Sequence, residues 1–300
     1  MNKETLAARQ QLPLEQKVAM TRQRILEFDA AMDGAVYVSF SGGKDSTVLA
    51  HIARETLGDV PLVFCDTGME YPEVRDFALS MATEVIKPKK TFKQVVEQHG
   101  YPFPSKEQAR YVHDVRHGTE KMRDLRLNGY KGRSYALSRK WYPLIDAQFD
   151  VSDYCCSVMK KHPFAEYEKR TGRSRIDGIM AEESSLRMNR YIANGGCNVF
   201  SAKRPHSSPM AFWTEQDVLD YVSGRGIDIA SVYGKIVEDG GTLRCTGVSR
   251  TGCMFCMFGV ALEKSPNRFE LMRQTHPAQY RYCMDKLGCA TVLDMFGIPR

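Results

Sequence analysis

Long apolar runs are absent from this chain of 300 residues. The longest, such as residues 35–40, are far shorter than the roughly 18 consecutive apolar residues that a membrane-spanning helix needs. The first residues, MNKETLAARQQ, also lack the apolar core of a signal peptide. We therefore expect no membrane segment and a cytoplasmic location.

The composition also lacks the extremes that mark unusual classes of protein. Hydrophobic residues make up 43% of the chain and charged residues 26%, which excludes a disordered chain, a collagen-like chain and a small disulfide scaffold. We find no internal repeat and no low-complexity tract. A chain of this length can bury enough apolar surface to fold without cross-links, either as about two domains or as one large α/β domain.

Excess charge of one sign is missing from most of the chain. The formal net charge is +6, and residues 103–142 alone contain ten Lys or Arg against four Asp or Glu, with tyrosines interspersed. This segment predicts contact with a polyanion such as tRNA or DNA, and a solvated helical surface is the alternative. The cations predicted to contribute are Arg123, Arg126, Lys131 and Arg133.

Cysteine, in contrast, is plentiful. Nine cysteines are many for a chain expected in a reducing compartment, where structural disulfides do not persist. Clustered cysteines in such a chain indicate metal binding or redox chemistry. The clusters are Cys155-Cys156 and Cys253-Met-Phe-Cys256. We predict that the other five are small buried side chains: Cys65, Cys197, Cys245, Cys283 and Cys289.

Predicted strands and helices alternate along the chain. Apolar, β-branched segments predict strands, at residues 35–40, 60–65, 83–87 and 175–180. Apolar residues at helical spacing predict helices, at residues 3–32, 47–57, 71–82, 213–223 and 266–286. The Gly- and Cys-rich residues 240–260 predict a loop. The alternation predicts an α/β fold with a parallel sheet covered by helices on both faces.

The same pattern divides the chain into parts. We expect an N-terminal helix at residues 1–34, an α/β domain at residues 35–230, and a Cys-rich loop with C-terminal helices at residues 231–300. A basic helical insertion at residues 91–150 interrupts the α/β pattern. Thr214, with Asp217 three residues further on, predicts the start of the helix at residues 213–223.

A phosphate-binding loop is indicated directly after the first predicted strand, where the chain reads Ser-Gly-Gly-Lys-Asp-Ser at residues 41–46. The glycines allow close approach of the main chain to a ligand, and the following helix N-terminus favours an anion. Because Asp45 follows Lys44, the loop is not a Walker A motif, nor does it match G-x-G-x-x-G. A purely structural glycine turn is the alternative.

These residues resemble the PP-loop of the adenine-nucleotide α-hydrolase superfamily. Residues 66–73, DTGMEYPE, look like an element of the phosphoadenosine-phosphosulfate (PAPS) reductase family, and residues 178–187 and 209–218 are similar to two further elements. The resemblance implies a Rossmann-like α/β fold that binds ATP, PAPS or adenosine phosphosulfate (APS) with Mg²⁺, the adenine lying near residues 66–68. The nucleotide-binding residues that it implies are Ser41, Gly42, Gly43, Lys44, Asp45, Ser46, Asp66, Thr67, Gly68, Glu70, Gly178 and Glu183. It also implies catalytic roles for Lys44, Asp45 and Arg187.

Residues 155–164, CCSVMKKHPF, are similar to a cysteine element of the iron–sulfur-containing assimilatory reductases of this family. There the element pairs with a later C-x-x-C to hold a 4Fe–4S cluster, with Lys160 or Lys161 suited here to offset the cluster's negative charge. The ligands that the resemblance implies are Cys155, Cys156, Cys253 and Cys256. A structural zinc site and cysteines without a ligand remain alternatives.

The chain also departs from the family. Met180 stands where the family usually has arginine, and the C-terminus lacks the E-C-G-[LI]-H element that carries the nucleophile of sulfite-forming members. We expect Cys283 and Cys289 to be packed rather than catalytic.

Three functions are compatible with these features. The first is ATP-dependent, pyrophosphate-releasing sulfur transfer to a nucleic acid, with a sulfur-donor protein as partner. The second is reduction of PAPS or APS to sulfite, with a thioredoxin-like partner. The third is a non-catalytic, nucleotide-binding regulatory or prophage accessory protein.

Overall fold

The computed structural model describes residues 1–300 and divides into two compact units. Unit 1 comprises Met1–Asp66, Glu70–Lys87 and Pro163–Thr251, and unit 2 comprises Thr67–Met69, Pro88–His162 and Gly252–Arg300. The basic segment and the C-terminal residues after Thr251 therefore belong to one unit, although the sequence pattern predicted that they belong to different parts of the chain. None of the helices is both long enough and apolar enough to cross a membrane.

A six-stranded sheet forms the centre of unit 1, in the order β3-β2-β1-β4-β6-β5. All neighbouring strands are parallel except β5 and β6, which are antiparallel. The strands are β1 (Val36–Phe40), β2 (Leu62–Cys65), β3 (Glu84–Ile86), β4 (Ser174–Ile176), β5 (Asn198–Val199) and β6 (His206–Ser207). This confirms the predicted Rossmann-like α/β class, although β4 is shorter than the strand predicted at residues 175–180.

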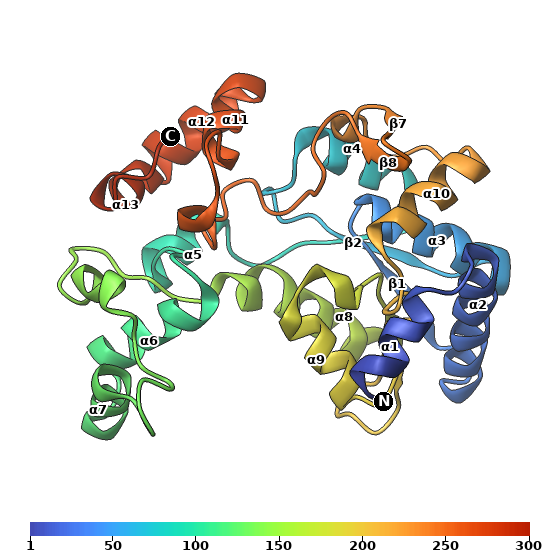
Figure 1. The fold of residues 1–300 in the computed structure, drawn as a ribbon, viewed down its shortest axis with the longest axis horizontal. Coiled ribbons are helices and arrows are strands. Elements are labelled where there is room, and N and C mark those ends of the chain that lie inside the picture. The colour runs from blue at the N-terminus through green and yellow to red at the C-terminus, as the bar shows by residue number, and fades with distance from the viewer. The chain divides into compact units, whose positions relative to one another are not determined.

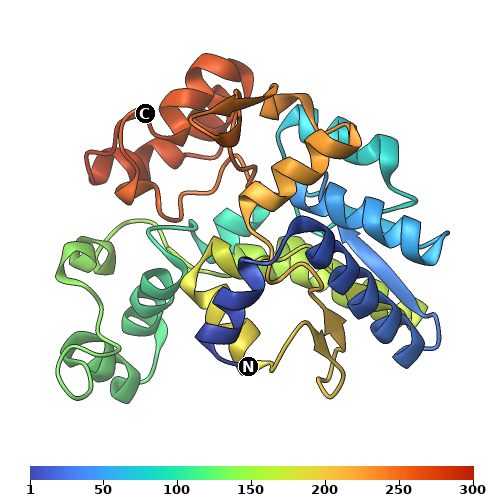
Figure 2. The same ribbon diagram turned by 45° about the vertical axis from the view of Figure 1, so that its right-hand side comes forward.

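The two faces of the sheet are covered by different helices, because side chains alternate along a strand. Val36, Val38 and Phe40 belong to the main core, together with residues of α2 (Leu14–Ala31), α3 (Lys44–Leu57) and α10 (Glu215–Arg225). Tyr37, between them in sequence, packs instead against Tyr167 of α8 (His162–Thr171). Figure 1 shows α2, α3 and α10 beside the sheet, and Figure 2 shows α2 and α3 side by side.

Local sequence explains where the helices of unit 1 begin. The predicted helix at residues 3–32 is two helices, α1 (Lys3–Gln10) and α2, because Pro13 stands at the N-cap of α2. The predicted Thr214–Asp217 capping box is present at the start of α10. The remaining helices of unit 1 are α4 (Pro72–Met81) and α9 (Ser185–Ala193).

The prediction of a loop at residues 240–260 is wrong for its first part. Residues 236–245 form a hairpin of β7 (Ile236–Asp239) and β8 (Thr242–Cys245). Gly240 and Gly241, with φ of +59° and +83°, make the two-residue turn that this hairpin requires.

Unit 2 is helical. Its helices are α5 (Phe92–His99), α6 (Lys106–His117), α7 (Glu120–Asn128), α11 (Arg268–Thr275), α12 (Pro277–Arg281) and α13 (Cys289–Met295). The helix predicted at residues 266–286 is interrupted, because Pro277 begins a new helix, α12. Phe103, Trp141 and Phe296 pack with ring centroids 5.2 to 5.3 Å apart and join the basic segment to the C-terminal helices.

Candidate functional site

The loop at residues 41–46 connects β1 to the first turn of α3. Gly42 has φ +73°, and a Cβ atom on it would lie 2.6 Å from the main-chain oxygen of Val74 and 2.9 Å from the Cβ of Ala78. Only glycine fits this position, because a side chain would be strained in φ and would collide with α4. The close approach of the loop to α4 fixes its path from strand to helix.

Hydroxyl groups hold the loop in shape. The Ser41 N–H donates to Ser46 Oγ at 3.2 Å, and the Gly43 N–H donates to Ser41 Oγ at 3.3 Å. The hydroxyl of Ser46 donates to the main-chain oxygen of Gly43 at 2.9 Å. The loop is therefore preorganised at the N-terminus of α3, where main-chain N–H groups and the helix dipole favour an anion.

Lys44 is the buried cation of this loop, with 3% of its side chain exposed. Its Nζ lies 3.1 Å from Glu215 Oε1 and 3.6 Å from Asp45 Oδ1, and it donates to the main-chain oxygen of Ser249 at 2.9 Å. Burial acts to lower the pKa of Lys44, but the carboxylates of Asp45 and Glu215 outweigh it and raise that pKa. The loop therefore holds a charged ammonium group at neutral pH.

Asp45 combines burial with an unsatisfied oxygen. Burial raises the pKa of Asp45, although the charges of Lys44 and Arg250 oppose the shift. Its Oδ1 atom is buried and has no hydrogen-bond partner. Gly178 lies against the same residue, where a Cβ would be 3.2 Å from the main-chain oxygen of Asp45. The chain after β4 thus approaches the loop closely, and a carboxylate oxygen of Asp45 remains to bind a cation or to accept a hydrogen bond.

Glu183 and Arg187, both predicted site residues, form an ion pair. Arg250 binds the same carboxylate at 2.7 Å, and the Met180 N–H donates to it at 3.0 Å. Burial and the nearby charge of Arg250 lower the pKa of Arg187, whereas the charge of Asp45 opposes this. Two guanidinium groups therefore share one carboxylate near Asp45.

Sequence reasoning missed the residues that close over the loop. The Tyr233 hydroxyl accepts from the Lys44 N–H at 3.2 Å and lies 2.6 Å from Thr251 Oγ1. Glu215 and Ser249 hold the Lys44 ammonium group. The capping box at residues 214–217 was the one sequence signal nearby, because it places Glu215 in the first turn of α10.

Asp66, predicted to lie near adenine, is ion-paired within unit 1. Arg75 donates to its two carboxylate oxygens at 3.0 and 2.9 Å, and Lys87 Nζ lies 3.8 Å away. Thr67 and Gly68 begin the short piece of unit 2 that follows β2, and Gly68 has φ +71°. Glu70 is half-buried where the chain returns to unit 1.

The four predicted metal-ligating cysteines line one cavity in unit 2. The sulfur atoms of Cys155 and Cys156 are 4.0 Å apart at the start of a π-helical turn. The segment that carries Cys253 and Cys256 is fixed by a hydrogen bond from the Met254 N–H to the main-chain oxygen of Met69 at 2.8 Å. The other lining residues are Met69, Phe92, Pro102, Met159 and Lys160.

The charges around this cavity favour one thiolate. A hydrogen bond from Cys155, followed by the charges of Lys106 and Lys160, lowers the pKa of Cys156 to about 6 against the effect of burial. The same hydrogen bond raises the pKa of Cys155, and burial raises the pKa of Cys256 to about 11. Lys160 lines the cavity, whereas Lys161, the other lysine considered, is exposed and does not.

The thiols are packed closely but are not arranged around a point. No three His, Cys, Asp or Glu side chains converge to hold a single metal ion. The cavity has a volume of about 20 Å³, which is near the space that one water molecule occupies. Binding of a larger group would therefore require the cysteine side chains to turn outward.

Four of the five remaining cysteines are buried, as predicted: Cys65, Cys197, Cys283 and Cys289. Cys245 is half-buried in β8. Cys283 and Cys289 are both 0% exposed, and a hydrogen bond between them raises the pKa of Cys283. Neither thiol is presented as a nucleophile.

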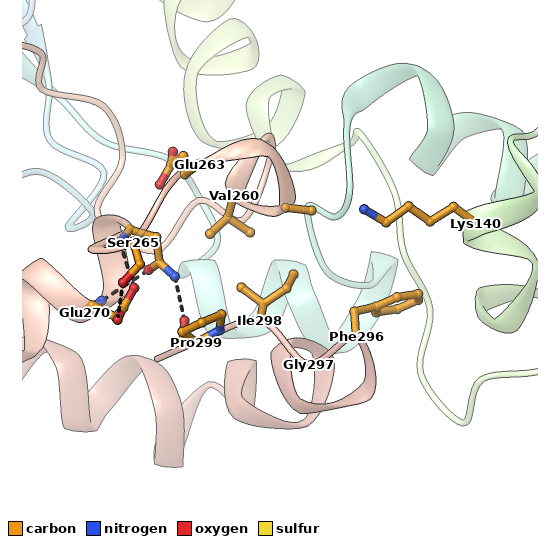
Figure 3. A pocket seen from close by; sticks show the side chains of 11 residues that line it. Lys140, Val260, Glu263, Ser265, Glu270, Phe296, Gly297, Ile298 and Pro299 are labelled. Carbon is orange, nitrogen blue, oxygen red and sulfur yellow. Dashed lines mark hydrogen bonds between the residues drawn. The ribbon is translucent and has the colours of Figure 1, made fainter.

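A second cavity of unit 2, of about 200 Å³, lies between the C-terminal residues 296–299 and the segment 260–270. Figure 3 shows that Glu270, one of the acidic side chains that line it, is bonded by its neighbours. Glu270 accepts from the Asn267 N–H at 2.8 Å and from the Ser265 hydroxyl at 3.1 Å. The Asn267 side chain donates to the main-chain oxygen of Pro299 at 2.7 Å. These contacts fix the C-terminal residues against the segment 260–270.

The sheet order defines an α/β protein in which a glycine-containing loop, suited by its geometry to an anion, follows the first strand. A family model described as the phosphoadenosine phosphosulfate reductase domain matches residues 35–289, so the chain belongs to this family. The family is one of enzymes. Membership of an iron–sulfur-containing subtype stays a prediction.

Individual relatives are distant. The chain is 24% identical over 278 residues to an uncharacterized protein of Methanocaldococcus jannaschii, covering 91% of this chain and 53% of that protein, so it spans about half the relative's length. It is 26% identical over 246 residues to sulfate adenylyltransferase subunit 2 of Shewanella woodyi, covering 78% and 72%. The crystal structure of PAPS reductase from Candida auris in a phosphate complex aligns with TM-score 0.42 and 14% identity, covering 81% and 98%.

Proposed function

We propose that this chain catalyses ATP-dependent, pyrophosphate-releasing transfer of sulfur to a nucleic-acid acceptor. It would carry a 4Fe–4S cluster on Cys155, Cys156, Cys253 and Cys256. The observation that carries the proposal is the meeting of these four thiols around one cavity, although about a hundred positions separate the two pairs in the chain. A phosphate loop alone would equally suit a protein that only binds nucleotide.

The loop residues would hold the phosphates of ATP. The N–H groups at the start of α3 and the hydroxyls of Ser41 and Ser46 provide donors, and Lys44 provides a positive charge. Glu215 and Ser249 contact the Lys44 ammonium group in this structure, so a phosphate would have to replace them as the partner of this ammonium group. The guanidinium groups of Arg187 and Arg250, which share Glu183 here, would face the negative charge on the oxygens of the transferred phosphoryl group.

Asp45 fits a ligand of Mg²⁺. Its buried Oδ1 atom has no hydrogen-bond donor, and carboxylate oxygen is the ligand that Mg²⁺ prefers. Burial disfavours the charge of this carboxylate when no cation is bound. A bound Mg²⁺ would supply the missing charge and neutralise the phosphates beside Lys44.

The cysteine cavity fits a thiolate-ligated cluster by the chemistry of its donors. Four sulfur ligands, apolar lining residues and a nearby lysine are the features that iron–sulfur clusters require. When bound, such a cluster would supply a site that holds a sulfur atom or exchanges an electron. Zinc is the rival, because four cysteines also suit a structural zinc ion.

The proposed reaction balances in two steps. An oxygen atom of the acceptor attacks the α-phosphorus of ATP, and the bond to the β-phosphate oxygen breaks to release pyrophosphate. A sulfur nucleophile delivered by a donor protein then displaces AMP from the activated carbon. The similarity to a sulfate adenylyltransferase subunit supports adenylyl transfer, since that relative is named for this chemistry.

The reductase alternative is less favoured. Sulfite formation from PAPS or APS needs an accessible, activated thiolate. The two C-terminal cysteines are fully buried, and we expect no thioredoxin-dependent sulfite formation. Robust sulfite release that is abolished by Cys283→Ser or Cys289→Ser would overturn the sulfur-transfer proposal.

The experiment starts from protein purified without oxygen, with iron, acid-labile sulfide and zinc measured per chain. Pyrophosphate release from ATP is then followed with RNA, DNA or sulfate as acceptor, for the wild type and for Lys44→Met. Lys235→Ala is the matched control, because Lys235 is an exposed lysine of the same unit.

We expect about four iron atoms per chain. We also expect nucleic-acid-dependent pyrophosphate release that Lys44→Met reduces at least about a hundredfold. Stoichiometric zinc without iron would contradict the cluster. Pyrophosphate release with sulfate alone would show that sulfate, rather than a nucleic acid, is the acceptor. Nucleotide binding without turnover would favour the regulatory alternative.

A further inference from the structure

We propose that the turn at residues 129–138 of unit 2 binds a single-stranded nucleic acid, whose unpaired bases stack on Tyr130 and Tyr135. The inference deepens the proposed function and rests on it for the biological role of the strand, because it names the form of acceptor that this unit takes. It is carried by the division of the basic segment into side chains that the fold uses and side chains that it leaves exposed.

Three cations of the segment donate hydrogen bonds within the fold. Arg133, which was also predicted to contact the polyanion, donates to the main-chain oxygens of Leu127 at 3.4 Å and of Leu137 at 2.8 Å. Arg126 is 7% exposed, donates to Asp114 Oδ2 at 2.8 Å, and lies 3.9 Å from the centre of the Tyr111 ring. Arg116 donates to the main-chain oxygen of Phe149 at 2.6 Å. Arg126 was predicted to contact the polyanion, and its burial corrects that prediction. It is a packing residue of α7.

The turn itself is held in an unusual conformation. Lys131 and Tyr135 have φ of +48° and +64°, in the left-handed region that bulky residues rarely adopt. The Tyr130 N–H donates to the Ser134 main-chain oxygen at 2.9 Å, and the Arg126 guanidinium donates to that of Tyr135 at 3.1 Å. Strained backbone that is held by such contacts is concentrated at functional sites.

In this conformation, two tyrosine rings of the turn are exposed to solvent. Tyr130 is 57% exposed and Tyr135 is 60% exposed, five positions apart in the same turn. Single exposed aromatic residues are common on protein surfaces, but here two exposed rings belong to one strained turn. Lys131 Nζ lies 5.5 Å from the Tyr130 ring centre, so a positive charge accompanies one of these rings.

Exposed cations surround this turn in the chain. Lys121, Arg123, Lys131 and Arg139 are all exposed, and none is paired with an acidic side chain. Helices α6 and α7 pack on each other, and the short helix that begins at Arg139 packs on α6 (green in Figure 1), so one substructure carries the whole set. Cations that follow a phosphate backbone and rings that stack on bases together favour a single strand, because a duplex hides the faces of its bases.

The test measures binding by fluorescence anisotropy, with the full-length protein and a fluorescein-labelled oligonucleotide of about 20 nucleotides. Single-stranded RNA, single-stranded DNA and the matching duplexes form separate arms, each without ATP and at several salt concentrations. The stacking variant is Tyr130→Ala with Tyr135→Ala, and Tyr130→Phe keeps the ring. The charge variant carries Lys121→Ala, Arg123→Ala and Arg139→Ala. Its matched control removes three charges at exposed lysines of unit 2 outside the segment, by Lys93→Ala, Lys264→Ala and Lys286→Ala.

We expect the stacking variant to bind single strands at least about tenfold more weakly, and Tyr130→Phe to bind like the wild type. The charge variant should lower the slope of log affinity against log salt by about 2, that is, about 0.7 for each of its cations. The lysine control should change neither quantity. RNA and DNA arms show which strand is preferred.

Equal binding of duplex and single strand, or undiminished binding by the stacking variant, would overturn the proposal. So would the absence of binding at low salt. Because none of the binding measurements contains ATP, their results can be interpreted even if the protein does not transfer sulfur. Binding without pyrophosphate release would refute the catalytic proposal alone.

Discussion

The nucleotide loop of unit 1 and the cysteine cavity of unit 2 are built in opposite ways. The loop is six consecutive residues that run from the end of β1 into the first turn of α3, and Ser41, Ser46 and Tyr233 already bond its polar groups. The cavity brings together two pairs of thiols that are about a hundred positions apart. A locally built loop keeps its shape without a ligand, whereas a site made from distant segments gains stability from the group that joins them. The following predictions test this difference, from the largest expected effect to the smallest.

The largest effect is expected at the cavity. Cys253→Ser with Cys256→Ser should abolish iron binding and the absorbance near 400 nm that such clusters show, and lower the midpoint of thermal unfolding by about 10 °C or more. The affinity for ATP should change by less than about threefold, since the loop lies in the other unit. Iron analysis, circular dichroism and calorimetry measure these quantities. Cys245→Ser, a half-buried cysteine outside the cavity, is the control. Loss of ATP affinity together with iron would show that the two sites depend on each other.

The loop should instead be sensitive to steric change. Gly42→Ala should lower the free energy of unfolding by about 4 kcal/mol, because it combines a left-handed φ with a collision against α4. Gly226→Ala has a left-handed conformation, with φ of +59° and ψ of +39°, but nothing within 4 Å, and should cost about 1 kcal/mol. Chemical denaturation of both variants separates strain from collision, and ATP calorimetry should show a large loss for Gly42→Ala only. Equal costs would mean that the contact with α4 does not shape the loop.

Within unit 2, buried and exposed arginines of the basic segment should behave differently. Arg126→Ala leaves Asp114 without its partner and removes the packing on Tyr111, and should cost about 3 kcal/mol of stability. Arg123→Ala, three residues earlier, should change stability by less than about 0.5 kcal/mol. Urea denaturation measures both. If Arg126→Ala does not lower the free energy of unfolding, Arg126 would again be a candidate contact for the polyanion.

Asp45→Asn should separate stability from ligand binding. Burial raises the pKa of Asp45, so the folded protein pays for this charge above that pKa, and the penalty disappears as pH falls through it. At neutral pH the variant without nucleotide should therefore be as stable as the wild type or about 1 kcal/mol more stable, and the difference should shrink in acid. Its affinity for Mg²⁺–ATP should fall at least about tenfold. Destabilisation at pH 7 would show that Lys44 depends on this carboxylate rather than on Glu215.

The smallest effect is expected at Tyr233. Its hydroxyl occupies the Lys44 N–H, which a phosphate oxygen would also use. Tyr233→Phe should lower stability by about 1 kcal/mol and tighten ATP binding a few fold, because the ligand then satisfies an N–H that is otherwise unbonded. Thr251→Val removes the neighbouring hydroxyl but leaves that of Tyr233, and calorimetry should show little change. Weaker ATP binding by Tyr233→Phe would indicate that the hydroxyl contacts the nucleotide rather than competing with it for the Lys44 N–H.

Much of the fold was predictable because its signals are local. The alternation of strands and helices, the glycines of the loop and the Thr214 capping box each act within a few residues, and all are present in the structure. Two errors came from single residues that outweigh a periodic pattern. Pro13 and Pro277 each interrupt a predicted helix, because proline lacks the N–H that continues it.

The sequence by itself determined which groups could do chemistry: the phosphate loop at residues 41–46 and the two cysteine pairs, both recognisable from residue type and spacing. Only the tertiary structure decided how they are surrounded. Tyr233 and Glu215 approach the loop from far along the chain, and Arg126 is buried by Asp114 and Tyr111 although it lies only three residues from exposed Arg123 in the same helix. Burial and ion pairing depend on contacts between distant segments, which residue type and local spacing do not encode.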